Sequence, residues 1–430
     1  MGDSSFTVKP MSSTSSLTSA RRRVVVSGLG IVSALGIDED TVWQNLVSGK
    51  TGIGMLRSLD TEKLKTHIGA EVPEGVLEAK LKSLGRRPLD RSVDMAIAAT
   101  HDALIQSGYI KEGEELEEQD VPIILGSGTG TMQSHGVGYQ TLHEKGIQAM
   151  RPTTVPKCMY NAISGAISMQ FRLTGTNYIV VSACTSGTNA IGVAYRMIRD
   201  GYADRVVTGG ADAFFYPFSY GAWNNIGALS RIEDPLKACR PFAADREGTA
   251  LGEGAGTLIL EARDVAKARG ARIRGEILGY GESSDATHLT RPSADGQAKA
   301  MRAALAEAGL APSDIALINA HGTGTPGNDS CESQSIRQVY GDAADDVPLV
   351  ANKSYFGHTL GASGALECIS SLLSMEKGIA PPNLNLENPD PECRVKLVGG
   401  EPMPIKRGPV MKNSFGFGGG NGVLILGPAD

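Results

Sequence analysis

One cysteine in this sequence stands where covalent chemistry is favoured. Cys184 lies in Ser182-Ala-Cys-Thr-Ser-Gly187, between a β-branched run at 178–182 and a helical pattern from about 185 to 199. A sharp strand-to-helix turn exposes a nucleophile at a sheet edge, and a helix N-terminus lowers a cysteine pKa. Taken alone, the segment fits a small buried hydrophobe equally well.

Two histidines shift that balance towards a catalytic site. His321 follows a predicted strand at 315–319 and begins His-Gly-Thr-Gly-Thr-Pro326, whereas His358 lies in the glycine-containing segment 353–367. A single histidine in a loop is more often structural. Two histidines at the ends of strand-like segments indicate a catalytic site, because histidine is the residue type suited to proton transfer near neutral pH. A glycine-rich segment at 413–421 precedes the last predicted strand and completes the set.

The elements that must position these residues alternate along the chain. The expected strands are 24–26, 121–125, 178–182, 205–208, 257–261, 273–280, 315–319 and 423–426, and the expected helices are 38–49, 91–107, 185–199, 264–269, 296–308 and 363–376. Such alternation predicts an α/β fold with helices covering the sheet faces. The chain divides near residue 270 into two parts of similar outline, 21–270 and 271–430, which suggests a structural duplication. The Ser- and Thr-rich residues 1–20 are predicted to be a disordered tail, native or a tag remnant.

Composition excludes several classes of protein. The chain has 430 residues with a net charge of −6, which argues against nucleic acid as the main partner. No apolar run approaches the roughly 20 residues of a membrane span, and none of the six cysteines forms a C-x-x-C pair typical of zinc or thioredoxin sites. We therefore expect no membrane association, no metal site, and free thiols in the cytoplasm. The 54 glycines cluster in short runs, where backbone must turn tightly or approach something closely.

Together these segments resemble the β-ketoacyl-ACP synthases, the elongating condensing enzymes of the thiolase superfamily. The resemblance runs from about Arg22 to Leu426 and rests on five segments. These are the Cys184 segment, Glu253-Gly-Ala-Gly256, the His321 segment, Lys353 with His358, and Asn413-Ser-Phe-Gly-Phe-Gly-Gly419. It implies a thiolase-like five-layer αβαβα fold built from two similar halves, with the synthase II type and type II polyketide ketosynthases as the most similar subgroups.

The resemblance also implies a reaction that needs no cofactor. Cys184 would take an acyl chain from acyl carrier protein as a thioester, and malonyl-carrier would lose CO2. The resulting carbanion would attack that thioester and give a β-ketoacyl chain two carbons longer. His321 and His358 would donate to the enolate oxygen.

Further roles follow from the same resemblance. The backbone N–H groups of Cys184 and Phe417 would hold the oxyanion, and Phe415 and Phe417 would gate the site. Lys353 would hold His358, Glu367 would brace the loop, and Thr323 and Thr325 would bind the pantetheine arm.

The partner of Cys184 and His321 is a histidine, His358, where relatives that start chains have asparagine, so decarboxylating elongation is favoured. The predicted function is fatty acid elongation. The alternative is the catalytic ketosynthase of a type II polyketide or polyene system that pairs with a chain-length factor. A non-catalytic scaffold is disfavoured because the cysteine is present. The resemblance implies a homodimer, or a heterodimer in the second case.

Two regions bear on specificity. The aromatic stretch from Phe214 to Trp223 matches a region that lines the acyl pocket and dimer interface in relatives, so Trp223 is either interface packing or a residue that narrows the pocket. Thr129 is a second pocket candidate. Because acyl carrier protein is acidic, its docking site should be basic, and Arg86 and Arg87 are candidates for it.

Overall fold

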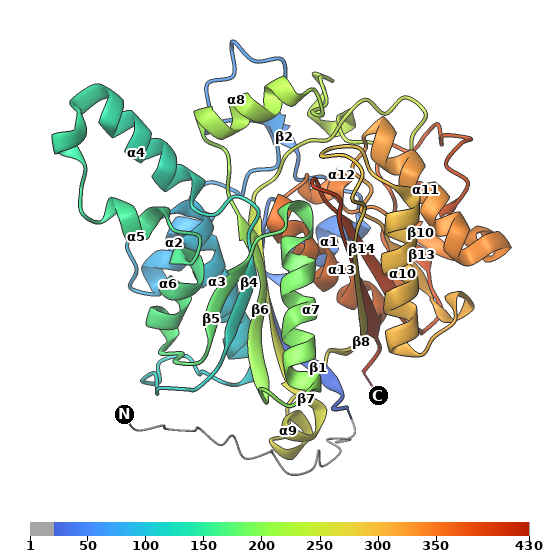
Figure 1. Ribbon diagram of the computed structural model, residues 1–430, viewed down its shortest axis with the longest axis horizontal. Helices are drawn as coiled ribbons and strands as arrows, with labels where there is room; N and C mark the ends of the chain where they lie inside the picture. The colour runs from blue at the N-terminus through green and yellow to red at the C-terminus, as the bar shows by residue number, and fades with distance from the viewer. Residues whose placement is uncertain (1–20, 430) are drawn as a thin grey trace, which may run out of the picture.

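The computed structural model describes residues 21–429, so the predicted tail at 1–20 lies outside the described residues (Figure 1). Every strand and helix predicted from the sequence is present, with ends displaced by up to several residues. Within the described residues, no helix combines the length and apolar character required to cross a bilayer.

The strands form two sets with the same internal order. In the first part of the chain they are β1 (Val24–Ser33), β4 (Ile123–Gly126), β5 (Asn177–Val180), β6 (Arg205–Asp212) and β7 (Gly254–Ala262), arranged β1-β7-β6-β4-β5. In the second part they are β8 (Gly275–Ser284), β9 (Leu317–Asn319), β10 (Pro348–Val350), β14 (Val410–Phe415) and β15 (Gly420–Gly427), arranged β8-β15-β14-β9-β10. In each set the fourth strand of the order, β4 or β9, pairs in parallel with both neighbouring strands. The second strand of the order, β7 or β15, pairs antiparallel with both neighbouring strands. This repeated order confirms two similar halves.

The two sets join at one end into a single sheet. Residues 24–26 of β1 pair with residues 275–277 of β8 in antiparallel register. With the short strand β12 (Lys396–Leu397) at the far edge, the joined sheet has eleven strands. The two halves are therefore held together by backbone hydrogen bonds as well as by side-chain packing.

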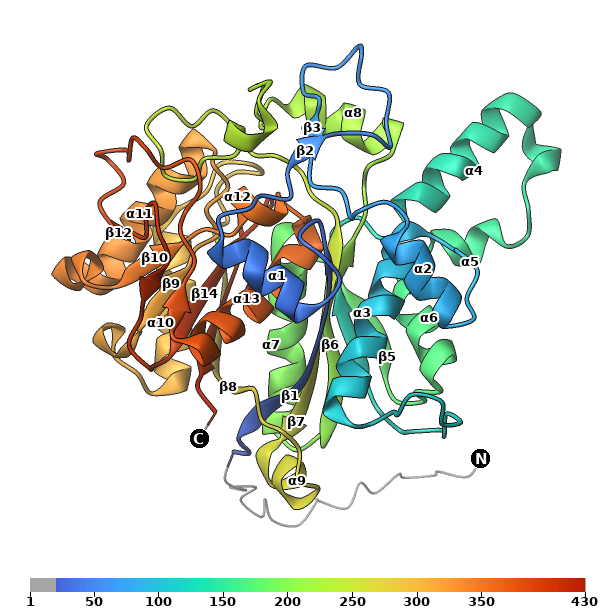
Figure 2. The ribbon, with the colours of Figure 1, turned by 180° about the vertical axis from the view of Figure 1, so that it is seen from behind.

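Helices complete the five layers (Figures 1 and 2). Between the two sets of strands lie α7 (Ser186–Arg199) and α13 (Ser363–Lys377), which pack against each other. The outer faces are covered by α3 (Arg91–Ser107) with α6 (Ala162–Phe171), and by α10 (Ala294–Ala308) with α11 (Pro326–Tyr340). All residues of α13 from Ser363 to Met375 are buried, as expected of a helix enclosed on all sides. The thiolase-like five-layer fold is confirmed.

The remaining elements are peripheral or line the site. They are α1 (Glu39–Val47), β2 (Gly54–Met55), β3 (Ile68–Gly69), α2 (Val76–Ser83), α4 (Met132–Lys145), α5 (Thr154–Cys158), α8 (Pro217–Ile226), α9 (Arg263–Ala268), α12 (Lys353–Phe356), β11 (Ile379–Ala380) and β13 (Met403–Pro404). Residue 270 falls between α9 and β8, and a domain division there stays a prediction.

Close backbone packing accounts for part of the glycine content. A Cβ atom added at Gly30 of β1 would lie 1.8 Å from the carbonyl oxygen of Ala99 in α3. A Cβ atom at Gly210 of β6 would lie 2.4 Å from the carbonyl oxygen of Gly361, which precedes α13. Glycine lets these layers approach at distances that any side chain would prevent.

Candidate active site

Cys184 lies in a strained turn between β5 and α7. The preceding residue, Ala183, has a φ of 52°, in the left-handed region that non-glycine residues rarely adopt. The Ser186 hydroxyl accepts a hydrogen bond from the Ser182 N–H at 2.9 Å and donates to the Ala183 carbonyl at 2.7 Å. These local bonds hold the turn and present Cys184 at the end of the strand, as the elbow prediction requires.

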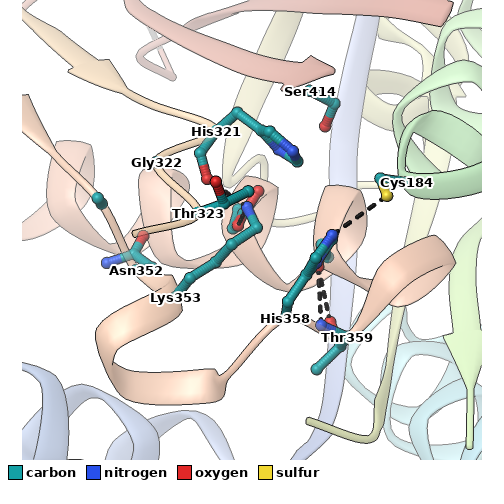
Figure 3. A network of polar contacts seen from close by, with 12 residues as sticks. Cys184, His321, Gly322, Thr323, Asn352, Lys353, His358, Thr359 and Ser414 are labelled. Atoms are coloured by element: carbon teal, nitrogen blue, oxygen red, sulfur yellow. Dashed lines mark hydrogen bonds and ion pairs between the residues drawn. The ribbon is translucent and has the colours of Figure 1, made fainter. Parts of the chain in front are cut away.

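His358 is in direct contact with the cysteine (Figure 3). Its Nε2 lies 3.1 Å from Cys184 Sγ, and its Nδ1 lies 3.2 Å from Ser363 Oγ at the start of α13. Ser363 Oγ also accepts from the Thr359 N–H at 3.0 Å, which fixes the serine beside the ring. The second half of the chain therefore places an imidazole on a nucleophile that the first half supplies.

His321 lies beyond the end of β9 and faces the same space. Its ring centroid is 5.5 Å from that of His358, edge to face, and 5.8 Å from that of Phe415. The N–H groups of His321 and Gly322 each donate to the buried carboxylate of Glu332 at 2.8 Å, which holds the turn. The His321 Nδ1 atom is buried and has no hydrogen-bond partner.

The lysine prediction needs one correction. Lys353 Nζ donates at 2.5 Å to the carbonyl oxygen of His321, whereas the prediction had it holding His358. It also pairs at 2.5 Å with Glu367 of α13, and the role of Glu367 as a brace for the loop stays a prediction. Lys353 begins α12, five residues before His358, so its ammonium reaches across to the neighbouring strand end rather than along its own segment.

The electrostatics of the resting site differ from the prediction for Cys184. Burial raises the pKa of its thiol to about 11, although Lys353 and the backbone N–H groups of Phe417 and Cys184 act in the opposite direction. The expected lowering by the helix N-terminus is therefore wrong, because desolvation of the thiolate outweighs it. Burial and the Lys353 charge also lower the pKa of both His321 and His358 well below 6.5. The resting site thus combines a thiol with two neutral imidazoles.

A cavity of about 350 Å³ opens onto these groups. The predicted residues that line it are Cys184, Trp223, His321, Thr323, Thr325, His358, Phe415 and Phe417. The hydroxyls of Thr323 and Thr325 are 2.7 Å apart, and Thr325 caps α11. Phe417 is 36% exposed and its ring stacks on Trp223 of α8 at 5.7 Å between centroids. An aromatic pair therefore stands on the wall of this cavity.

Three predicted residues lie elsewhere. Thr129 does not line the cavity, and its hydroxyl donates to the buried carboxylate of Asp212 at 2.8 Å. Arg86 and Arg87 lie between α2 and α3 and do not line it either. Among the residues described, no three His, Cys, Asp or Glu side chains are arranged to hold a metal ion.

Sequence reasoning missed three buried charged residues around the site. Asp212 accepts from the N–H groups of Gly128 and Gly361 at 2.8 and 2.6 Å, and so links the two halves. Glu332 supports the His321 turn, and Lys412 of β14 lies 3.0 Å from Glu367. A charge directly after the apolar pair Val410-Met411, in a segment that leads into the glycine-rich loop, was a signal that could have pointed to the last of these.

The five-layer fold, with a cysteine from one half and two histidines from the other, defines a thiolase-like condensing enzyme. The chain belongs to the β-ketoacyl synthase family. The family's N-terminal domain model (Beta-ketoacyl synthase, N-terminal domain) matches residues 21–266, and its C-terminal domain model matches residues 274–387.

Relatives named 3-oxoacyl-[acyl-carrier-protein] synthase 2 match nearly the whole chain. The Coxiella burnetii protein is 40% identical, over 94% of this chain and 98% of its own. The Staphylococcus aureus protein (strain COL) is 36% identical, over 95% and 99%.

Solved structures agree with this assignment. The ishigamide ketosynthase/chain length factor superposes with a TM-score of 0.87 at 35% identity, over 96% of this chain and all of the matched chain. A type II polyketide ketosynthase solved in complex with its acyl-carrier protein gives a TM-score of 0.86 at 27% identity, over 95% of this chain and 100% of the matched chain. A β-ketoacyl synthase from Burkholderia phymatum gives 0.86 at 34% identity, also over 95% and 100%.

Proposed function

We propose that the chain is a β-ketoacyl-[acyl-carrier-protein] synthase that elongates fatty acyl chains by decarboxylative condensation. The observation that carries this is the contact of 3.1 Å between His358 Nε2 and Cys184 Sγ at a cavity that His321 also lines. The relatives named 3-oxoacyl-[acyl-carrier-protein] synthase 2 support the same reaction and acyl carrier protein as the partner.

Acylation is the first half of the proposed reaction. Cys184 Sγ attacks the carbonyl carbon of an acyl-carrier thioester, and its proton passes to His358 Nε2, which is neutral and within hydrogen-bond distance. Negative charge on the carbonyl oxygen is stabilised by the N–H groups of Cys184 and Phe417. The carbon–sulfur bond to the carrier then breaks, and the carrier thiol leaves with a proton.

Condensation is the second half. Malonyl-carrier loses its carboxyl group as CO2, and the electrons of that bond form an enolate whose oxygen accepts hydrogen bonds from neutral His321 and His358. The enolate carbon attacks the Cys184 thioester, a carbon–carbon bond forms, the carbon–sulfur bond to Cys184 breaks, and the leaving thiolate takes a proton from solvent. We propose that Thr323 and Thr325, which line the cavity, bind the pantetheine arm.

Acyl-carrier and malonyl-carrier proteins mixed with the purified chain test the proposal. We expect a β-ketoacyl-carrier product two carbons longer by intact mass, and none from Cys184→Ala. A wild-type protein that releases no CO2 and forms no product with any acyl chain length would contradict it.

The second candidate is the catalytic ketosynthase of a type II polyketide or polyene system. The structural match to the ishigamide ketosynthase/chain length factor at 35% identity favours it. Activity of the chain alone supports fatty acid elongation, whereas activity that appears only with a cysteine-lacking homologue supports this alternative.

We expect a dimer for either of these two functions. Strand β5 is the edge of the joined sheet, and exposed apolar side chains flank it at Met169, Tyr178 and Val181. An edge strand with unpaired backbone groups and apolar neighbours is suited to pair with another subunit. We infer that this edge is the subunit interface of a homodimer, or of a heterodimer with a chain-length factor. A cytoplasmic location stays a prediction.

A further inference from the structure

Lys412 is a fully buried lysine that the condensation steps above do not use. It lies on β14, two residues before Ser414, with no exposed surface. Burying an ammonium group costs several kcal/mol, so a position of this kind normally requires a paired charge. Lys412 Nζ has Glu367 Oε2 at 3.0 Å.

That carboxylate is already neutralised by another residue. Glu367 Oε1 pairs with Lys353 Nζ at 2.5 Å, so two ammonium groups share one buried carboxylate. Lys412 Nζ is otherwise surrounded by neutral oxygens, because it donates to Ser414 Oγ and, at 3.1 Å, to Thr188 Oγ1. With all three groups ionised, the cluster of Lys353, Glu367 and Lys412, called the lysine–glutamate cluster below, carries one excess positive charge. Burial lowers the pKa of Lys412, and the charge of Glu367 acts in the opposite direction and favours the ammonium form.

The cluster connects all parts of the site. Lys353 bonds to the His321 carbonyl, and Thr188 lies on α7, four residues after Cys184. The charged and titratable groups around the two histidines are Lys353 of α12, Glu367 and Cys368 of α13, Lys412 of β14, Glu332 of α11, Asp212 of β6 and Cys184 itself. The two acids outside the cluster, Asp212 and Glu332, accept from neutral backbone N–H groups, and burial raises the pKa of both, which disfavours their negative forms.

We propose that Lys412 is a positioning residue for the condensation: it gives the lysine–glutamate cluster a net positive charge that keeps His321 and His358 neutral and favours the enolate. This rests on the proposed function. Burial, Lys353 and, to a smaller extent, Lys412 lower the pKa of both histidines, which agrees with the geometry. A neutral imidazole still donates one hydrogen bond, and a nearby fixed positive charge stabilises negative charge as it develops on the substrate.

Lys412→Gln tests the inference because glutamine is neutral yet keeps hydrogen-bond donors for Ser414 and Glu367. Removing one positive charge raises the pKa of both histidines, so the acid limb of the pH profile for malonyl-carrier decarboxylation should move up by roughly one pH unit. At a given pH on the acid limb, kcat should therefore fall about tenfold, which is what a shift of one pH unit produces, with KM for malonyl-carrier little changed. Lys412→Arg should restore the wild-type limb, and exposed Lys406→Gln should leave it unmoved.

A measurement on the wild-type protein does not depend on variants that fold or on activity. In the full chain with ¹³Cε1-labelled histidine, the NMR signals of His321 and His358 should report neutral rings at pH 6. Titration midpoints near the ordinary histidine pKa of about 6.5 would overturn the inference. An active wild type whose acid limb is unchanged by Lys412→Gln would overturn this inference alone. A wild type that never decarboxylates malonyl-carrier would overturn the proposed function, and the role of Lys412 in it.

Discussion

At the scale of single residues, the catalytic side chains of the resting site are uncharged. The Cys184 thiol is 5% exposed and the imidazoles of His321 and His358 are buried with it. A free thiolate would oxidise or alkylate readily, whereas a buried thiol beside a neutral base reacts when a proton can be transferred. Nucleophilicity at Cys184 is therefore expected to depend on the bound thioester.

This state predicts how Cys184 reacts with iodoacetamide. With its thiol pKa raised to about 11, the thiolate fraction, and so the rate of alkylation, should rise about tenfold per pH unit from pH 7 to pH 10. The rate is measured by peptide mass spectrometry, with Cys184→Ser to identify the labelled peptide. A plateau at or below pH 8 would mean that the thiolate is already formed in the resting enzyme.

At the scale of elements, close contacts between layers fix where the strand ends lie. Gly30 brings β1 onto α3, and Gly361 brings the start of α13 onto β6. The site depends on these distances because its residues come from the ends of strands on both sides of α7 and α13. Strain in one layer is transmitted to the site through packed backbone.

Gly30→Ala tests this dependence on layer spacing. Its added Cβ atom would overlap the Ala99 carbonyl, so the free energy of unfolding should fall by about 1–3 kcal/mol or more. Gly54→Ala is the matched control, since no atom lies within 4 Å of its Cβ position, and it should change stability by less than about 0.5 kcal/mol. Urea unfolding measures both, and equal stabilities would show that β1 and α3 can separate without cost.

The position of Trp223 on α8 predicts that this residue affects the acyl-chain specificity. It lines the cavity from α8 and stacks on Phe417, so Trp223→Ala should enlarge the space for an acyl chain and change the ratio of kcat/KM for long over short chains by about tenfold. Phe218→Ala on the same helix is the control, because Phe218 is 65% exposed and does not line this cavity. An unchanged preference in the tryptophan variant would leave Trp223 as packing only.

The elements were predictable from the sequence to different degrees. Strongly patterned segments such as α3, α10 and α13 follow from apolar periodicity, and the Cys184 and His321 turns follow from strand ends next to glycine. Several elements were not predicted, and among them α4 shows no clear apolar face. The others include α2, α5, α6, α8, α11, α12 and the strand β14. The lysine–glutamate cluster could not be predicted, because its members meet only when three separate elements pack together, and a charge in a sequence does not state its depth.

The pKa of Cys184 was predicted in the wrong direction for a related reason. The helix N-terminus is visible in a sequence, but the depth at which the turn is buried is not. Desolvation acts on the whole charge of the thiolate, and the dipole of one helix end offsets only part of it.

At the scale of the whole molecule, the exposed edge at β5 predicts a subunit interface. Introducing charge there with the double variant Met169→Glu/Val181→Glu should shift the protein from about twice 45.0 kDa to the mass of one chain in sedimentation equilibrium. Leu236→Glu is the control, since Leu236 is 62% exposed and lies in the segment between α8 and β7. A double variant that remains dimeric would place the interface elsewhere.

Carrier-protein docking is a second property of the whole surface. Charge reversal at Arg86 and Arg87 should raise KM for acyl-carrier protein by about tenfold at low salt, with a smaller effect at high salt because screening weakens the attraction. Lys111→Glu, in an exposed loop, serves as the control. An unchanged KM would reject these arginines as the docking site, and their distance from the cavity lining makes this a stringent test.

The repeated strand order has a consequence for the asymmetry of the site. Cys184 follows β5 and leads into α7, and His358 follows β10 and leads into α13, so the two occupy matching places in the two halves. An assembly of two identical halves would have to carry the same residue at both places. On a single chain the two places can differ, and here one carries the thiol of Cys184 and the other the imidazole of His358. The asymmetry that the chemistry needs is thus carried by a fold that is symmetric in outline.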